Sequence, residues 1–284
     1  LLLTIYMYRR QVCCCFVLIA KLYSCGAFHF ISLRQQHGIS LQGGRPLLVE
    51  AKREHEGESR ENLYQWGKRL SLMARNGDSL GAKEAFQRMI QTGLRPNDFI
   101  YNAMIIANAN CGEIQGMEEW FARMQGDGIK ANQVTYGALM NAYASAGRTT
   151  EMKEWFAKMQ ESGISSNLVT YNTLMKGYAR KGDTTQCQHW YNDMMAAGIH
   201  PDVQTFNIIL NACAGAGDTA QMEEWFSAMQ EKGISADKFS YSTLLKGHSK
   251  KGNTARCQHW YDQMVLAGVQ PNVQTFNTLL IACA

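Results

Sequence analysis

The chain has 284 residues, of which 46% are hydrophobic and 18% are charged. This composition supports a folded core and excludes a disordered chain, and a proline content of 4 excludes a collagen-like or proline-rich protein. The formal net charge is +4, and it lies mostly in residues 1–62, which contain 8 Lys and Arg against 5 Asp and Glu. Residues 63–284 contain 20 and 19, so bulk charge gives no sign of a nucleic-acid partner there.

The 9 cysteines form no C-x-x-C pair, which argues against a zinc ribbon, a thioredoxin-type site and a deaminase-type zinc site. Cys187 and Cys257 are 70 residues apart, as are Cys213 and Cys283, which indicates repetition rather than disulfide pairing. We interpret the cysteines beyond residue 62 as small apolar core residues in a reducing compartment. His189 has no second ligand at metal-binding spacing, so we expect neither a metal nor another cofactor.

The first 62 residues have the composition of a targeting segment followed by a linker. Arg9 and Arg10 precede an apolar run over residues 12–20, which is too short to cross a bilayer core of about 30 Å. The run matches the start of a signal peptide, and residues 29–45 carry bases but no acid, as transit peptides do. Translated non-coding sequence is an open alternative. Residues 46–62 are acidic and suggest a solvated linker, so we expect a mitochondrial or plastid protein without a stable membrane span.

From residue 63 onwards the sequence repeats every 35 residues. Glycines, methionines and aromatic residues each keep this spacing, and five independent registers with one period are not a chance pattern. Two of the registers are Gly77, Gly112, Gly147, Gly182, Gly217 and Gly252, and Trp120, Trp155, Trp190, Trp225 and Trp260.

Residues 168–202 show the local pattern of one repeat. Apolar residues at helical spacing predict a first helix that Thr170 caps and that Gly182 ends in the left-handed conformation. Asp183 is expected to cap a second helix, with Gln186 as its capping-box partner, and Gly198 to end it. The second helix is expected to bury Cys187, Trp190, Tyr191 and Met194.

A helical hairpin of this size cannot bury its apolar face alone, whereas stacked hairpins can. We therefore predict an all-α, right-handed superhelical solenoid of 35-residue helix-turn-helix repeats. Its units one to six are residues 63–97, 98–132, 133–167, 168–202, 203–237 and 238–272, and a partial seventh unit covers 273–284.

The local text of the repeats resembles the pentatricopeptide repeat. Unit four opens with Val169-Thr-Tyr-Asn-Thr-Leu-Met175 and closes with Ala197-Gly-Ile-His-Pro-Asp202, and Val134-Thr-Tyr136 repeats the opening. The resemblance covers residues 63–284, and the constant length of 35 resembles the P class. The departures are a missing proline in three units and Trp-Phe or Trp-Tyr in place of the usual Leu-Phe. The resemblance implies sequence-specific binding of single-stranded organellar RNA, with one base for each repeat.

The resemblance further implies that each base is read by a small residue on the first helix together with the last residue of the unit. Carboxylates accept from the N–H donors of uracil and guanine, whereas amides donate to the ring acceptors of cytosine and adenine. A longer helix side chain suits a pyrimidine and a shorter one leaves room for a purine, so we predict the core 5′-Y-N-U-U-A-3′. Turn chemistry is the alternative reason for the Asn or Asp that ends every unit. The pairs of units two to six are Asn102/Asn132, Gly137/Asn167, Asn172/Asp202, Asn207/Asp237 and Ser242/Asn272.

Positions i, i+4 and i+8 of the first helix share a face, and in units four and six this face carries cations. We expect these cations to contact the RNA backbone, although units two and three lack them, as an ordinary solvated face would. The cations are Lys176, Arg180, Lys246 and Lys250.

We expect a role in organellar RNA processing, stabilisation, editing or translation, and no enzyme activity, because no constellation of catalytic residues stands out. One alternative is a protein-interaction solenoid, which the near-neutral charge of the repeats favours. The other is the RNA-binding part of a nuclease or deaminase whose catalytic domain follows residue 284.

Overall fold

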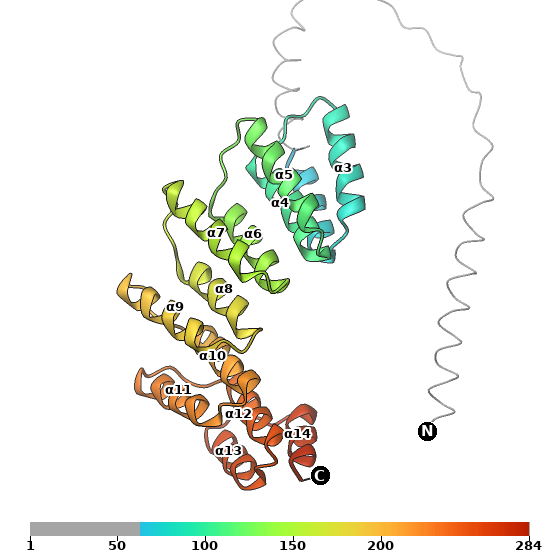
Figure 1. The fold of residues 1–284 in the computed structure, drawn as a ribbon. Coiled ribbons are helices and arrows are strands. Elements are labelled where there is room, and N and C mark those ends of the chain that lie inside the picture. The colour runs from blue at the N-terminus through green and yellow to red at the C-terminus, as the bar shows by residue number, and fades with distance from the viewer. Residues whose placement is uncertain (1–62, 284) are drawn as a thin grey trace, which may run out of the picture. The chain divides into compact units, whose positions relative to one another are not determined.

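The computed structural model describes residues 63–283, so the targeting and linker predictions for residues 1–62 lie outside the described part. Every regular element within residues 63–283 is helical, and none of these helices is long and apolar enough to cross a membrane. A helix over residues 63–76 comes first, and the others follow in chain order (Figure 1). They are α3 (Ser79–Gln91), α4 (Asp98–Cys111), α5 (Ile114–Gly126), α6 (Gln133–Ser145), α7 (Thr149–Glu161), α8 (Leu168–Ala179), α9 (Thr184–Ala196), α10 (Val203–Ala216), α11 (Thr219–Glu231), α12 (Lys238–Lys250), α13 (Thr254–Leu266) and α14 (Val273–Cys283).

Two kinds of helix occupy different places in the stack. The first helices of successive units, α4, α6, α8, α10, α12 and α14, each contact the next one. The second helices, α5, α7, α9, α11 and α13, contact the first helix of their own unit and that of the following unit. Within residues 63–283 no second helix contacts another second helix. The prediction of an all-α solenoid is therefore confirmed, with the first helices as its continuous row.

Glycine ends both helices of each repeat, as predicted. Gly182 has φ = 68° and Gly198 has φ = 73°, values that residues with a Cβ rarely adopt. The same conformation recurs at the equivalent glycines of the other units. The 35-residue glycine register is thus a register of turns.

The first helices begin three residues earlier than predicted. Asn167, not Thr170, caps α8: its Oδ1 accepts from the Thr170 backbone N–H at 3.0 Å, and its own N–H donates to Thr170 Oγ1 at 3.4 Å. This reciprocal capping box recurs at α6, α10 and α12. Asp183 caps α9 as predicted, but Gln186 does not complete a box, because the Asp183 N–H donates to the Tyr178 carbonyl oxygen.

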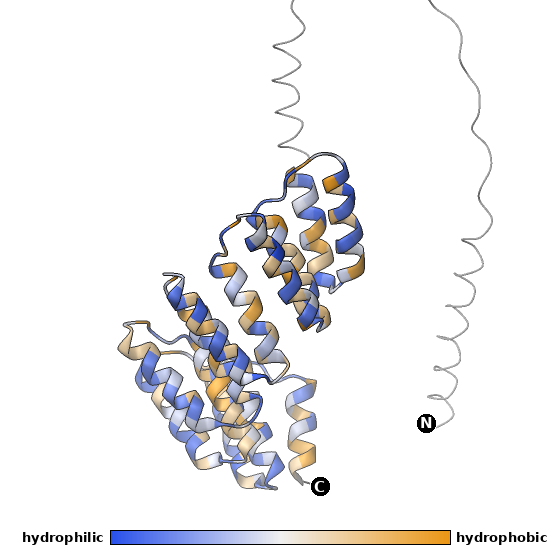
Figure 2. Ribbon diagram, turned by 45° about the horizontal axis from the view of Figure 1, so that its top comes forward, coloured by the Kyte–Doolittle hydropathy of each residue, from blue (hydrophilic) through white to orange (hydrophobic). Residues whose placement is uncertain are grey.

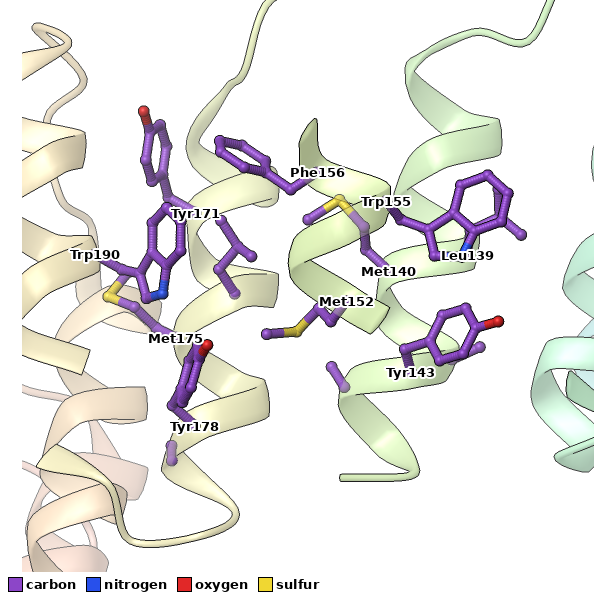
Figure 3. Packing of buried hydrophobic residues seen from close by; sticks show 14 of the residues in the cluster. Leu139, Met140, Tyr143, Met152, Trp155, Phe156, Tyr171, Met175, Tyr178 and Trp190 are labelled. Carbon is purple, nitrogen blue, oxygen red and sulfur yellow. The ribbon is translucent and has the colours of Figure 1, made fainter. Parts of the chain in front are cut away.

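Three aromatic rings fill each junction between units, as Figure 3 shows for one junction. Phe156 of α7 lies 6.1 Å from Tyr171 of α8 and 5.4 Å from Trp190 of α9 between ring centroids. Both contacts are edge-on, the geometry that aromatic quadrupoles favour. The Trp and Met registers are mostly core, as predicted, with Trp225 only half-buried. The other four clusters are Phe86/Tyr101/Trp120, Phe121/Tyr136/Trp155, Tyr191/Phe206/Trp225 and Phe226/Tyr241/Trp260.

Most repeat cysteines are core residues, as predicted. Cys187, Cys213 and Cys257 are buried, and burial raises the pKa of the Cys187 and Cys213 thiols to about 12, so both stay protonated. The prediction is wrong for Cys111, which is exposed near the end of α4. The described residues contain no group of three His, Cys, Asp or Glu that could hold a metal ion.

Candidate nucleic-acid interface

The exposed side of the first helices is hollowed at three places, and we call this side the groove. One hollow of about 530 Å³ is lined by α4, α6, α8 and α10, and the next, of about 500 Å³, by α8, α10 and α12. The third, of about 710 Å³, is lined by α10, α12 and α14. Hydrophilic and hydrophobic residues are interspersed along these helices (Figure 2). The groove is therefore a polar surface with apolar places, not an apolar pocket.

Most of the residues predicted to contact RNA line these hollows. Asn102, Asn132 and Asp202 line none of the three, and the hydrogen bonds that hold them are described below. The first hollow contains Gly137, Asn167, Asn172 and Lys176; the second contains Lys176, Arg180, Asn207 and Asp237; the third contains Asp237, Ser242, Lys246, Lys250 and Asn272.

In three units the two members of a predicted reading pair touch each other. Asn207 Nδ2 donates to Asp237 Oδ1 at 3.1 Å, and Asn172 Nδ2 donates to Asp202 Oδ1 at 3.5 Å. The amide of Asn102 makes the equivalent bond at 3.3 Å, with Asn132 as the acceptor. Residues that are 30 positions apart in the sequence thus form one polar unit at the groove.

A hydroxyl of the following helix fixes the orientation of each helix amide. Thr205 Oγ1 donates to Asn172 Oδ1 at 2.8 Å, and Ser240 Oγ donates to Asn207 Oδ1 at 2.6 Å. Because the amide oxygen accepts and the amide nitrogen donates within the protein, the amide cannot flip without losing both bonds. The sequence-based expectation of an open polar face is wrong for these amides: Asn102, Asn172 and Asn207 are only 5%, 6% and 7% exposed.

The last residue of each unit is also the N-cap of the next first helix. Asp237 Oδ1 accepts from the Ser240 N–H at 2.9 Å, and Asn132 Oδ1 accepts from the Thr135 N–H at 3.1 Å. The turn-chemistry alternative therefore explains part of the preference for Asn and Asp. Ser and Thr also cap helices, but only Asn and Asp carry a second polar atom beside the capping oxygen. That second atom is a donor in Asn and an acceptor in Asp.

The two carboxylate partners differ in their surroundings. Partial burial alone would raise the pKa of Asp237, but hydrogen bonds from Ser240, Asn207 and the Phe239 backbone outweigh it and lower that pKa below its ordinary value. Asp237 is therefore an ionised acceptor at neutral pH. At Asn132 the second atom is a donor, and it lies 3.0 Å from Asp98 Oδ2.

The two remaining pairs are less complete. Gly137 has no side chain to offer, and an added Cβ would meet no atom within 4 Å, so the position beside Asn167 is open space. Ser242 and Asn272 line the same hollow without a recorded hydrogen bond between them, although both belong to the described part of the chain. Unit three thus has one reading residue, and unit six has a short one.

The four predicted backbone cations are exposed and line the hollows. Within residues 63–283 no carboxylate lies within 4.0 Å of any of them. Lys176 Nζ donates to Asn141 Oδ1 at 3.1 Å, which holds the ammonium group above the junction of α6 and α8. Their role stays a prediction, but the placement leaves their charge available to a ligand.

The sequence analysis missed a row of exposed apolar side chains beside the pairs. Val134, Val169 and Phe239 occupy the second position of α6, α8 and α12, are more than half exposed, and line the hollows. Flat or branched apolar surface beside polar readers suits the stacking of nucleic-acid bases. The signal was available in the 35-residue register, three residues before each helix reader, but apolar residues in a helix were attributed to the core.

Comparison with known proteins agrees with this architecture. The sequence profile of the PPR repeat family matches residues 96–145, 131–180, 166–215, 205–250 and 239–284, and that of the pentatricopeptide repeat domain matches residues 58–111. No curated protein sequence matches the chain significantly.

Solved structures show the same fold at low sequence identity. The pentatricopeptide repeat protein PPR10 in complex with an 18-nt psaJ RNA element is 22% identical with a TM-score of 0.61, over 76% of this chain and 37% of that one. PPR10 from maize aligns with a TM-score of 0.59 at 22% identity, over 76% and 36%. Nuclear proteinaceous RNase P 2 from A. thaliana is 14% identical with a TM-score of 0.52, over 66% and 42%. The chain therefore spans less than half the length of these relatives. Its repeats, their turns and the matching profiles together show that the chain belongs to the pentatricopeptide repeat family.

Proposed function

We propose that the array binds single-stranded RNA in a sequence-specific manner, with one base for each repeat. The observation that carries this proposal is the contact between the two members of a reading pair, such as Asn207 and Asp237. Each such unit is held rigidly by helix-capping bonds and carries one polar atom that the cap does not use. Support also comes from PPR10, which shares the fold and whose structure was determined with a bound RNA element.

Base identity follows from that unused atom. In units four and five it belongs to a carboxylate, so a base with an N–H donor fits, and the helix amide favours a pyrimidine: uracil. In unit six an amide donor beside the short Ser242 fits adenine, and in unit two Asn132 favours cytosine with some uracil. Unit three has only a partial reader. The proposed core is therefore 5′-Y-N-U-U-A-3′, read with the chain parallel to the RNA.

Backbone contacts supply the affinity that base contacts do not. The four groove cations have no carboxylate partner within residues 63–283, so they are free to bind phosphates. Val169 and Phe239 offer apolar surface on which bases stack. Phosphate, stacking and base-edge contacts are thus available on one side of the array.

The biological setting is proposed from the sequence of residues 1–62, where a basic segment without acids precedes an acidic one. We place the protein in a mitochondrion or plastid, where it acts in RNA processing, stabilisation, editing or translation. A protein-interaction scaffold is the second candidate, because residues 63–284 carry almost equal numbers of bases and acids. A role as the RNA-binding part of a nuclease or deaminase uses the same groove, and no catalytic residue is assigned to this chain.

A salt titration separates RNA binding from a protein-interaction role. The protein is titrated against a labelled RNA containing the proposed core and against an RNA with the same bases in permuted order. Because each good base contact discriminates by about 1–3 kcal/mol, we expect the permuted RNA to bind at least about tenfold more weakly. With about four phosphate contacts, log K should fall against log salt with a slope of about −3.

Replacing Lys176, Arg180, Lys246 and Lys250 by Ala should weaken binding to both RNAs equally and make the slope shallower. Equal affinity for the two RNAs together with an unchanged slope in the Ala variant would reject base reading and favour the protein-interaction scaffold.

A further inference from the structure

The groove cations recur every 70 residues rather than every 35. Along the first helices of units three to six, the i+4 position is Asn141, Lys176, Asn211 and Lys246 in turn. The i+8 position is Ser145, Arg180, Gly215 and Lys250. We propose that the RNA backbone is gripped at every second repeat, by units four and six, while the phosphate opposite unit five is left without a cation. This inference rests on the RNA binding proposed above.

The packing of α8 and α12 shows that a two-repeat module underlies this alternation. Gly177 of α8 lies against Met152 so closely that a Cβ would come within 2.6 Å of the Met152 sulfur. Gly247 of α12 repeats this arrangement with Met222, at 2.7 Å from its terminal methyl carbon. The equivalent position in α6 and α10 is alanine. The first helices of units four and six therefore seat differently on the preceding second helix than those of units three and five.

A second contact repeats with the same 70-residue spacing. Lys181 Nζ donates to Thr149 Oγ1 at 2.9 Å, and Lys251 Nζ donates to Thr219 Oγ1 at 3.4 Å. These bonds join α8 to α7 and α12 to α11 outside the groove. Units four and six thus use one lysine to hold the preceding unit, and the two cations nearer the reading pair remain unpaired on the groove side.

The cations themselves are placed for phosphate rather than for carboxylate partners. Lys176 lines two hollows, Arg180 lines the second, and Lys246 and Lys250 line the third. Between these two sets, unit five presents the amide of Asn211 and the bare backbone of Gly215. An amide makes a neutral hydrogen bond that is weaker than a charge-assisted one and releases no counterion. Since one repeat accommodates one nucleotide, the two grips act on phosphates two nucleotides apart.

Neutralising one phosphate at a time tests this inference on the full chain. A series of RNAs with the 5′-CAUUA-3′ core carries a single methylphosphonate at successive linkages, each with a 2′-O-methyl group that protects it. The reference for each is the same RNA with a 2′-O-methyl phosphodiester. We expect two sensitive linkages, two nucleotides apart, each with a loss on the order of threefold to tenfold, and an insensitive linkage between them.

Variants then assign each sensitive linkage to a unit. Lys176→Ala with Arg180→Ala should abolish the sensitivity at one linkage only, and Lys246→Ala with Lys250→Ala at the other only. A gain of function is also available: Asn211→Lys with Gly215→Lys should make the middle linkage sensitive. An added Cβ at Gly215 meets no atom within 4 Å, and Asn211 is exposed, so the fold accommodates both lysines. Asn211→Ala with Gly215→Ala is the matched control and should leave the middle linkage insensitive.

The outcomes distinguish this inference from the function on which it rests. Binding of the unmodified RNA with equal sensitivity at all linkages, or with the pattern unchanged in the paired variants, overturns the two-nucleotide grip and leaves RNA binding standing. Failure of the wild-type protein to bind the unmodified RNA overturns the proposed function itself.

Discussion

The side-chain amide of Asn207 donates to the carboxylate of Asp237 at 3.1 Å, although the two residues lie 30 positions apart and belong to successive repeats. The same carboxylate oxygen caps α12 by accepting from the Ser240 N–H. One oxygen of Asp237 therefore serves the fold, and the other is available to a ligand. This division explains how a residue needed for helix capping can also vary between Asn and Asp.

Replacing the capping residue should separate these two uses. Asp202→Ala removes the cap of α10 and should cost about 1 kcal/mol of unfolding free energy, whereas Asp202→Asn keeps a capping oxygen and should cost much less. Urea unfolding followed by circular dichroism measures both. If the two variants lose the same stability, the capping role assigned to Asp202 is wrong.

The lowered pKa of Asp237 predicts a pH dependence of stability. An unfolded Asp titrates near about 3.9, and a carboxyl with a lower pKa in the folded state stabilises the protein above that value. That stabilisation is lost as pH falls from about 4 through the folded pKa. We expect the urea midpoint of the wild type to exceed that of Asp237→Asn at pH 7, and the difference to shrink at pH 3. A difference that stays constant over this range contradicts the ionised state of Asp237.

The exposed apolar row should matter for RNA and not for folding. Phe239 is 55% exposed, so Phe239→Ala should change stability by no more than about 0.5 kcal/mol. Loss of a stacking surface should weaken RNA binding by about 1–3 kcal/mol. Leu266→Ala on α13 is the matched control, because Leu266 is 79% exposed and lines none of the three hollows. Equal RNA affinity in the two variants, measured by fluorescence anisotropy, would remove Phe239 from the interface.

The aromatic clusters should dominate the stability of the unit junctions. Phe121 is buried, with its ring centroid 5.9 Å from that of Tyr136 and 4.9 Å from that of Trp155. Phe121→Ala should cost about 3–5 kcal/mol, and Phe121→Leu much less, because leucine fills most of the space. Denaturant unfolding followed by Trp fluorescence gives both values. A loss below about 1 kcal/mol for Phe121→Ala would show that the junction is not held by these rings.

The 35-residue register was enough to predict the helices, their turns and the core. Glycines at fixed spacing must supply positive φ, and Trp and Met at helical spacing must be buried, so residues such as Gly182 and Trp190 were placed from the sequence alone. The helix starts were misplaced because Leu168 and Val169 precede the apolar stripe, although the cap Asn167 lies before them. A capping residue separated from the stripe by one turn gives no periodic signal.

The burial of Asn172 could not be predicted, because it depends on a neighbour in the next unit. Its amide is covered when Thr205 and Asp202 close over it, and this contact joins residues about 30 positions apart. Hydropathy along one helix contains no information about such a contact. The exposed Val169 was missed for the opposite reason, since an apolar residue in a helix usually belongs to the core.

The most direct test of base reading is selection from a random RNA pool, with the wild-type protein and the Asp202→Asn, Asp237→Asn double variant run in parallel. Both substitutions keep the capping oxygen and exchange an acceptor for a donor, so the fold is retained while the reading atoms change. The wild type should select a consensus that contains UU at the positions of units four and five, and the double variant should select CC there. An identical consensus from both proteins, or no consensus from either, would contradict base reading by these residues and favour the protein-interaction scaffold.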